Sequence, residues 1–161
     1  MSKIYVDEIL PKDNATVDGS NISGNIVQIV SMPNPSTPFD FNGTSDATCT
    51  SVNFTPKFAN SKIWITSTIN FRDAATNTSG YFTIYQDSTA VTGGVGEMYA
   101  DGSTTLYGSC VHNLLLDAGS TTTRNYSLKV RVASGGATWR TFWETSGNNR
   151  GSFVRIMEIA Q

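Results

Sequence analysis

Apolar residues recur at every second position in one segment of this 161-residue chain after another, and this spacing is the strongest constraint on its fold. Alternation of this kind places apolar side chains on one face of a β-strand. Segment 62–71 carries them at Ile63, Ile65, Ile69 and Phe71. Segment 125–133 carries them at Tyr126, Leu128, Val130 and Val132. Because no segment offers about ten residues with apolar positions at helical spacing, we expect an all-β fold.

The same pattern, less regular, marks six further segments: 25–31, 49–54, 80–86, 106–115, 137–144 and 152–160. Clusters of Gly, Asn, Asp and Pro separate them, as expected for turns. About eight antiparallel strands in a chain of this length are typical of a jelly-roll β-sandwich. We therefore predict an antiparallel sandwich of jelly-roll type that forms a head over residues 25–161.

The first 24 residues do not fit this sandwich. They begin with an apolar stretch between charges, SKIYVDEILPKD, which is followed by about a dozen polar residues without a core pattern. That gap is longer than a hairpin turn needs. We therefore predict that residues 1–24 are an extended N-terminal arm. Four apolar side chains of this arm are expected to dock it on another protein or on a neighbouring subunit: Ile4, Val6, Ile9 and Leu10.

Two of the predicted strands, 80–86 and 137–144, have aromatic residues on both faces. A sandwich buries only one face of each strand, so the second set needs other cover. Isolated surface aromatics are ordinary, but here they gather on strands and point to burial between subunits. We predict a homotrimer with four aromatic residues at or near the subunit contacts: Tyr81, Tyr85, Trp139 and Trp143.

The sequence shows no catalytic or metal-binding constellation. His112, the single histidine, lies two residues from Cys110 on a predicted strand, but no orienting group accompanies the pair. The Gly-rich segment 92–103 lacks the Lys-Ser/Thr pair of a phosphate-binding loop. Cys49 and Cys110 could form one disulfide, although two buried thiols are favoured because free Cys is among the most buried residue types. We expect no enzyme, no cofactor and no metal site.

Charge and hydropathy also restrict the partners. The net charge is −2, and 11 Lys and Arg are scattered among 13 Asp and Glu, so the basic stripe of a nucleic-acid-binding protein is missing. No apolar run approaches the roughly 20 residues of a membrane span. The first residues also lack the apolar segment of a secretory signal. We expect neither nucleic acid nor a membrane as a partner.

The polar loops suggest a recognition surface. If successive strands alternate in direction, loops 32–48, 72–79, 117–123 and 145–151 gather at the end opposite the arm. Recognition commonly resides on loops carried by a rigid sandwich, although plain solvated turns are an equal alternative. The residues that we expect to contact a ligand there, in particular a glycan, are Phe39, Phe41, Arg72, Asn77, Asn148, Asn149 and Arg150.

Both ends and the middle of the chain resemble the short tail-fibre-type proteins of tailed bacteriophages. The matching stretches are SKIYVDEILPK with the following GNIVQIV, then FTPKFANSKIWITSTINF, and finally SFVRIMEIAQ. The resemblance implies a homotrimeric jelly-roll head on the outer surface of a virion, docked by its arm and assembled in the reducing cytoplasm of the host. None of the matching stretches is catalytic.

Two interpretations remain open within this resemblance. Fibre chains of this kind often carry a long shaft between arm and head, and this chain has none. We expect a short tail-fibre-type protein that contacts tail or baseplate proteins and recognises a host-surface glycan. The alternative is a capsid decoration (cement) protein that binds the major capsid protein and stabilises the shell. A depolymerase acting on host polysaccharide ranks third, because clustered acidic residues are not evident.

Overall fold

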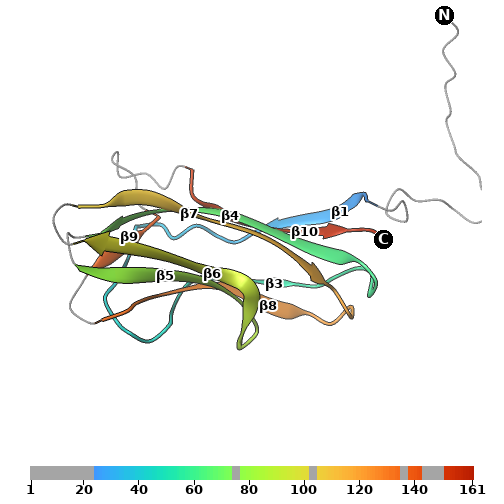
Figure 1. Cartoon of the computed structure of the whole chain (residues 1–161). Helices are drawn as coiled ribbons and strands as arrows, with labels where there is room; N and C mark the ends of the chain where they lie inside the picture. The colour runs from blue at the N-terminus through green and yellow to red at the C-terminus, as the bar shows by residue number, and fades with distance from the viewer. Residues whose placement is uncertain (1–23, 74–76, 102–104, 135–137, 143–150) are drawn as a thin grey trace, which may run out of the picture.

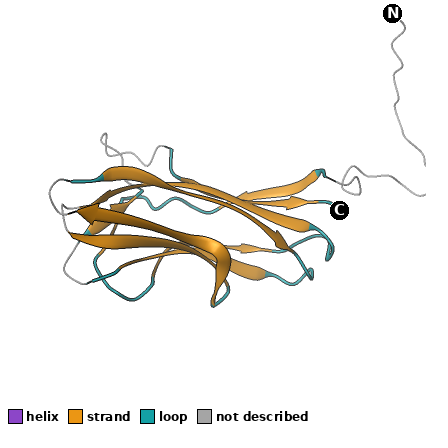
Figure 2. Ribbon diagram, viewed as in Figure 1, coloured by secondary structure: helices purple, strands orange, loops and turns teal. Residues whose placement is uncertain are grey.

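The computed structural model describes residues 24–73, 77–101, 105–134, 138–142 and 151–161. Their strands are β1 (Ile26–Ser31), β2 (Phe39–Phe41), β3 (Ala47–Phe54), β4 (Lys62–Asp73), β5 (Asn77–Gln86), β6 (Thr89–Asp101), β7 (Tyr107–Asp117), β8 (Arg124–Val132), β9 (Trp139–Thr141) and β10 (Phe153–Ile159). Figure 2 shows strands and loops throughout these ranges. The described residues contain no helix long and apolar enough to cross a membrane.

The strands form two sheets that lie one over the other (Figure 1). In sheet A, β4 pairs with β7 on one side and with β10 and β9 on the other, while β1 flanks β10 and β2 flanks β9. Sheet B has the order β3-β8-β5-β6. All of these pairs are antiparallel. The predicted antiparallel sandwich of jelly-roll type is confirmed.

The core lies between the sheets, where the alternating apolar residues meet. Both inward faces predicted from segments 62–71 and 125–133 are buried. Four aromatic rings pack together between the sheets, at one end of the sandwich: Phe41, Phe71, Phe82 and Trp139. Strict alternation on β4 and β8 therefore defines the core, as the sequence predicts.

Strand β6 was not predicted, because its Gly-rich sequence is typical of a loop. The structure shows why glycine is needed at one position. At Gly96, β6 passes so close to β7 that a Cβ atom would lie 2.2 Å from Sγ of Cys110. Asp87, with a φ of 55°, makes the tight turn that leads from β5 into β6. The three-residue strand β2 was also missed, within the predicted loop 32–48.

Strand β9 is shorter than the predicted strand 137–144. It ends at Thr141 because Phe142 has a φ of 54°, which interrupts the extended backbone. This bend turns Phe142 inward, and its side chain is buried together with Trp139. The predicted alternation was therefore wrong at Phe142, and residues 143 and 144 of the predicted strand lie outside the described residues.

The two ends of the sandwich are distinct. At the proximal end, where the chain enters, the Gly24 N–H donates to the Ala160 carbonyl at 2.8 Å. Strand β4 runs from this end to the distal end, where β9 and β2 pair. Loop 117–123 lies at the proximal end, since Asp117 is paired with Lys62. Its predicted distal position was wrong, because the missed strand β6 reverses the direction of β7.

Candidate functional site

Four side chains form a row across the distal end of sheet A, on its outer face. The strand register places Tyr107 of β7, Arg72 of β4, Arg140 of β9 and Asp40 of β2 side by side. Arg140 donates two hydrogen bonds to the Asp40 carboxylate, one of them from Nη2 to Oδ2 at 2.6 Å. These hydrogen bonds hold the pKa of the Asp40 carboxyl below its ordinary value. We call these four residues the distal row.

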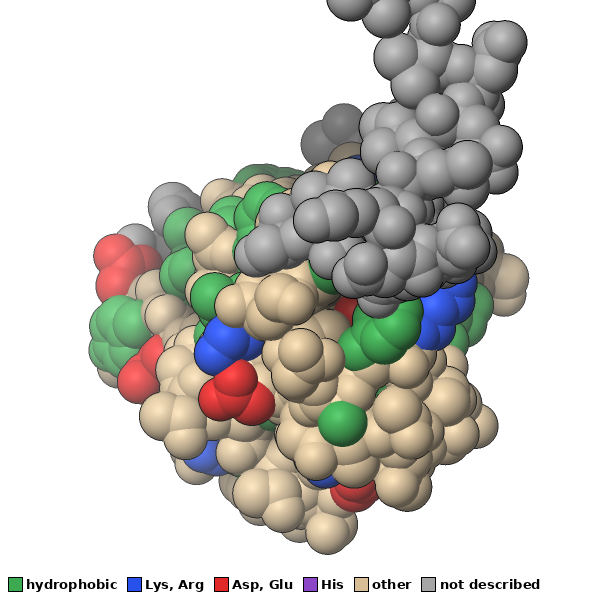
Figure 3. All heavy atoms as spheres, turned by 90° about the vertical axis from the view of Figure 1, so that its right-hand side faces the viewer, with side chains coloured by type: hydrophobic (Ala, Val, Ile, Leu, Met, Phe, Trp, Pro, Cys, Tyr) green, Lys and Arg blue, Asp and Glu red, His purple; other side chains and the backbone are tan. Residues whose placement is uncertain are grey.

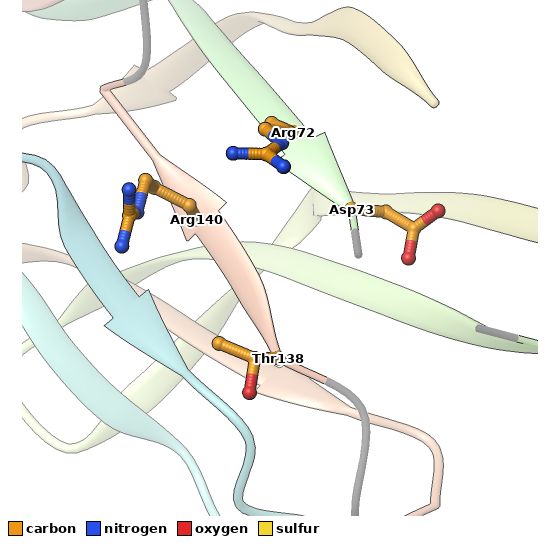
Figure 4. Close-up of a pocket in the computed structure, with 4 residues that line it drawn as sticks. All are labelled: Arg72, Asp73, Thr138 and Arg140. Atoms are coloured by element: carbon orange, nitrogen blue, oxygen red, sulfur yellow. The ribbon is translucent and has the colours of Figure 1, made fainter. Parts of the chain in front are cut away.

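A small pocket of about 80 Å³ lies beside the distal row and is lined by Arg72, Asp73, Thr138 and Arg140. Figure 4 shows Arg72 and Arg140 on neighbouring strands, with the Asp73 carboxylate directed away from both guanidinium groups. Small-molecule pockets usually measure about 300 Å³ or more. The distal row therefore offers a surface contact, in which arginine donors lie next to the exposed ring of Tyr107.

The other predicted recognition residues are dispersed. Phe41 is only 5% exposed and packs edge-on against Phe82, so its proposed role in stacking on a ligand was wrong. Phe39 is half-buried against the core. Asn77 is exposed at the start of β5, where it accepts a hydrogen bond from the Tyr99 hydroxyl. Three further predicted residues lie outside the described residues: Asn148, Asn149 and Arg150.

On the outer face of sheet B, charged side chains pack against two tyrosine rings of the same chain. Arg131 lies 3.9 Å from the ring centre of Tyr81, and Lys129 lies 4.0 Å from that of Tyr85. The Tyr81 hydroxyl also donates to Glu97 at 2.9 Å. Each ring therefore has a cation over it within the single chain and remains partly exposed, which weakens the reason for placing Tyr81 and Tyr85 at a subunit contact.

Trp139 was predicted to be buried at or near a subunit contact, but its side chain is fully buried inside the single chain and needs no second subunit to cover it. Its ring centre lies 5.4 Å from that of Phe71 and 6.4 Å from that of Phe82. Trp143, the fourth aromatic residue predicted there, lies outside the described residues, as do the four arm residues Ile4, Val6, Ile9 and Leu10.

An apolar row crosses the outer face of sheet A nearer the proximal end. In register across four strands lie Ile29 of β1, Met157 of β10, Trp64 of β4 and Leu115 of β7. Ile29 is 57% exposed and Leu115 is 62% exposed. We call these four residues the proximal row. The sequence carried a signal that we missed, since the segment 106–115 is apolar at positions on both faces.

A buried carboxylate joins three distant segments at the proximal end. Oε1 of Glu158 accepts hydrogen bonds from the amides of Lys57 and Phe58 at 2.9 Å and from Ser61 Oγ at 2.7 Å. Its Oε2 accepts one from Gln28 Nε2 at 2.6 Å. Burial alone would raise the pKa of this carboxyl, but the four donors together hold the pKa below its ordinary value.

The partners of Glu158 come from the same stretches that resemble the tail-fibre-type proteins. Gln28 belongs to GNIVQIV, Lys57 and Ser61 belong to FTPKFANSKIWITSTINF, and Glu158 belongs to SFVRIMEIAQ. These stretches therefore meet in space, and the hydrogen bonds of Glu158 fix the loop before β4 against β10. Sequence reasoning gave no sign of this contact.

Cys110 and His112 lie close together but in a packed interior. Sγ of Cys110 is 3.9 Å from Nε2 of His112, which also contacts the Phe82 carbonyl at 3.1 Å, while Nδ1 is 2.8 Å from Ser67 Oγ. Burial raises the pKa of the Cys110 thiol to about 11, so it stays protonated at neutral pH. Cys49 and Cys110 are both free thiols; Cys110 is buried as predicted, whereas Cys49 is half-buried. Among the described residues, no three His, Cys, Asp or Glu side chains gather to hold a metal ion.

Comparison with protein families and with curated protein sequences finds no match. Solved structures do match in fold: infectious bursal disease virus of the Gt strain (TM-score 0.56, 17% identity), the VP2 subviral particle of that virus (TM-score 0.55, 18% identity) and its Gx strain (TM-score 0.52, 16% identity). Each similarity covers 99% of this chain, but only 38%, 37% and 37% of the respective viral chains. This chain therefore spans little more than a third of their length and is similar to them in fold.

Proposed function

We propose that this protein is a non-enzymatic structural protein on the outer surface of a tailed-phage virion, assembled in the host cytoplasm. It is a short tail-fibre-type protein, homotrimeric, that docks by its N-terminal arm. The observation that carries this proposal is the polarity of the sandwich. The chain enters at Gly24 at the proximal end, and the distal row lies at the opposite end of the same rigid body.

The fold and the sequence support this proposal independently. The sandwich is similar in fold to part of a chain of the VP2 subviral particle of infectious bursal disease virus, and this similarity supports a role in a virus particle. The three stretches that meet at Glu158 resemble tail-fibre-type proteins, and that resemblance rests on sequence alone. A virion protein of this kind needs a stable scaffold and two separate contact surfaces, and it needs no catalytic centre.

The distal row is the surface that we propose for host recognition. Its two arginines and the Asp40 carboxylate offer hydrogen bonds to the hydroxyl or acidic groups of a surface glycan. The exposed ring of Tyr107 offers an apolar face beside them. This pairing of a ring with charged groups is what a sugar, which has apolar faces and polar edges, would require.

A capsid decoration protein is the second candidate, and the fold similarity to a chain of the VP2 subviral particle over 99% of this chain favours it. In that case the arm binds the major capsid protein, and the distal row is simply a solvated end of the sandwich. The two candidates differ in the number of copies on each particle. They share the arm as the segment that attaches the sandwich.

Deleting residues 1–20 is expected to abolish incorporation into particles while the sandwich remains folded, since every described strand begins beyond that point. The measurement is immunoblotting of gradient-purified particles from a phage that lacks the gene and is supplied with either chain. A variant with Ser at positions 4, 6, 9 and 10 keeps the length of the arm and should fail in the same way, because it lacks the four apolar side chains proposed to dock it. Circular dichroism and thermal unfolding show whether both variants fold.

The proposal is contradicted if the truncated protein, folded and expressed at the normal level, is incorporated as well as the full chain. If truncation abolishes incorporation but the Ser variant is incorporated normally, the arm attaches the protein through groups other than its four apolar side chains.

A further inference from the structure

We infer that the outer face of sheet A around the proximal row is a surface on which a second copy of this chain packs. The face is formed by the outward side chains of β1, β10, β4 and β7. It is distinct from the arm and from the distal row. It also differs from the sheet B face, on which the sequence placed the subunit contact.

The composition of this face is that of a protein interface. Beyond the proximal row it carries Phe153 of β10 and Val111 of β7, both in register with Thr68 of β4. Val111 is 64% exposed. The next positions are uncharged and polar, apart from Arg155, whose guanidinium lies 4.7 Å from the ring centre of Phe153. Interface cores are enriched in aromatic residues, Met and Arg and are depleted of Lys, Asp and Glu.

The size of the face is close to the lower limit for a specific interface. Strands β4 and β7 have 12 and 11 residues, whereas β10 and β1 have 7 and 6. At about 3.3 Å per residue and about 4.8 Å between strands, the four strands cover about 570 Å², including the end that carries the distal row. With an equal area on the second copy, the contact would bury about 1,100 Å², and specific interfaces bury about 1,000 Å² or more in total.

The surface is hollowed at one place, where a partner side chain could enter. A depression of about 440 Å³ lies beside Phe153 and Arg155 and extends to Ser31 and Asn34. Figure 3, which views the proximal end, shows charged side chains of both signs interspersed among hydrophobic and other side chains of the sandwich. The depression lies where β1 ends and β10 begins, and it gives shape to that part of the contact.

A second copy is the occupant that the charges favour. Since the face carries Arg155 as its cation and no carboxylate among the outward positions of its four strands from Trp64 to Asn70, a neighbouring copy can cover it with few charges to desolvate. The outer face of sheet B, in contrast, holds Lys129, Arg131 and Glu97, which would need to be desolvated at a contact. The arm is assigned to the virion under the proposed function.

The test is sedimentation velocity of the full chain from about 1 to 100 µM, a range in which interfaces of this size associate. We expect the wild-type protein to associate. Leu115→Glu should weaken this association at least about tenfold, because the contact would bury an unpaired carboxylate. Val95→Glu is the matched control: Val95 is 54% exposed on β6 of sheet B, so this variant should associate like the wild type.

Three results would overturn the inference. The first is a wild-type chain that stays monomeric over the whole range. The second is a Leu115→Glu variant that associates as strongly as the wild type. The third is loss of association on deletion of residues 1–20, which would make the arm the occupant. The experiment needs no particles, so a negative result leaves the proposed attachment to a virion untouched, although a monomeric wild type would also contradict the proposed homotrimer. Failure of incorporation into particles, in turn, leaves this surface untouched.

Discussion

Trp139→Ala is expected to destabilise the sandwich by about 3–5 kcal/mol, the usual cost of truncating a buried tryptophan. The indole is fully buried and packs against Phe41, Phe71 and Phe82, so its removal leaves a cavity between the two sheets at the distal end. Urea unfolding, followed by tryptophan fluorescence and circular dichroism, measures the change in the free energy of unfolding. A loss below about 1 kcal/mol would contradict the central position of this ring.

A companion variant separates the contribution of the Trp139 ring from that of its polar group. Nε1 of Trp139 is buried and finds no hydrogen-bond partner among the described residues, so Trp139→Phe removes an unsatisfied donor and should cost far less than Trp139→Ala.

Gly80→Ala tests the packing around Trp139 from the opposite sheet. A Cβ atom at Gly80 would lie 2.6 Å from Cε3 of Trp139, and such overpacking costs about 1–3 kcal/mol. Gly43→Ala is its control, because the nearest atom there is 4.0 Å away.

Glu158→Gln is expected to destabilise the protein by about 3 kcal/mol. A side-chain amide has one oxygen in place of two and adds an NH₂ group that faces the donors of Lys57 and Gln28. Buried donors left without acceptors cost about 1–3 kcal/mol each. Asp117→Asn is the matched control, because that side chain is 79% exposed in its pair with Lys62 and such surface pairs contribute about 1 kcal/mol or less.

The same carboxylate should make stability depend on acid pH. Because the folded-state pKa of Glu158 lies below its unfolded value of about 4.3, its contribution is complete above that pH and is lost as the pH falls through the folded pKa. Wild-type stability should therefore decline between about pH 5 and pH 3 more steeply than that of Glu158→Gln. Parallel pH profiles of the two proteins would show that Glu158 is not the titrating group.

The fold class was predictable because it depends on short-range pattern. Strands β4 and β8 alternate strictly, and their inward side chains are buried as the sequence indicates. Strand β6 was not predictable, since Gly96 and its neighbours weaken the strand pattern for a reason that lies in another strand, the approach of Cys110. Missing one strand reversed the direction of the next, and loop 117–123 was consequently assigned to the wrong end.

The candidate site was predictable only in part. Arg72 was identified as a cation at the distal end. Its neighbours in the distal row come from β7, β9 and β2, and only the pairing register of these strands brings them beside it. Tyr81 and Tyr85 suggested a subunit contact, whereas Lys129 and Arg131 of the adjacent strand cover them. The partners of Glu158 are 97 to 130 residues away along the chain, and no local pattern marks them.

Counting this protein in intact virions tests the central claim most directly. Quantitative mass spectrometry of gradient-purified particles gives its ratio to the major capsid protein. The tail-fibre proposal predicts roughly a few dozen copies, in a multiple of three as a symmetric homotrimer requires. A few hundred copies would contradict that proposal and favour capsid decoration. Particles of normal composition that contain no copy would contradict a role on the virion altogether.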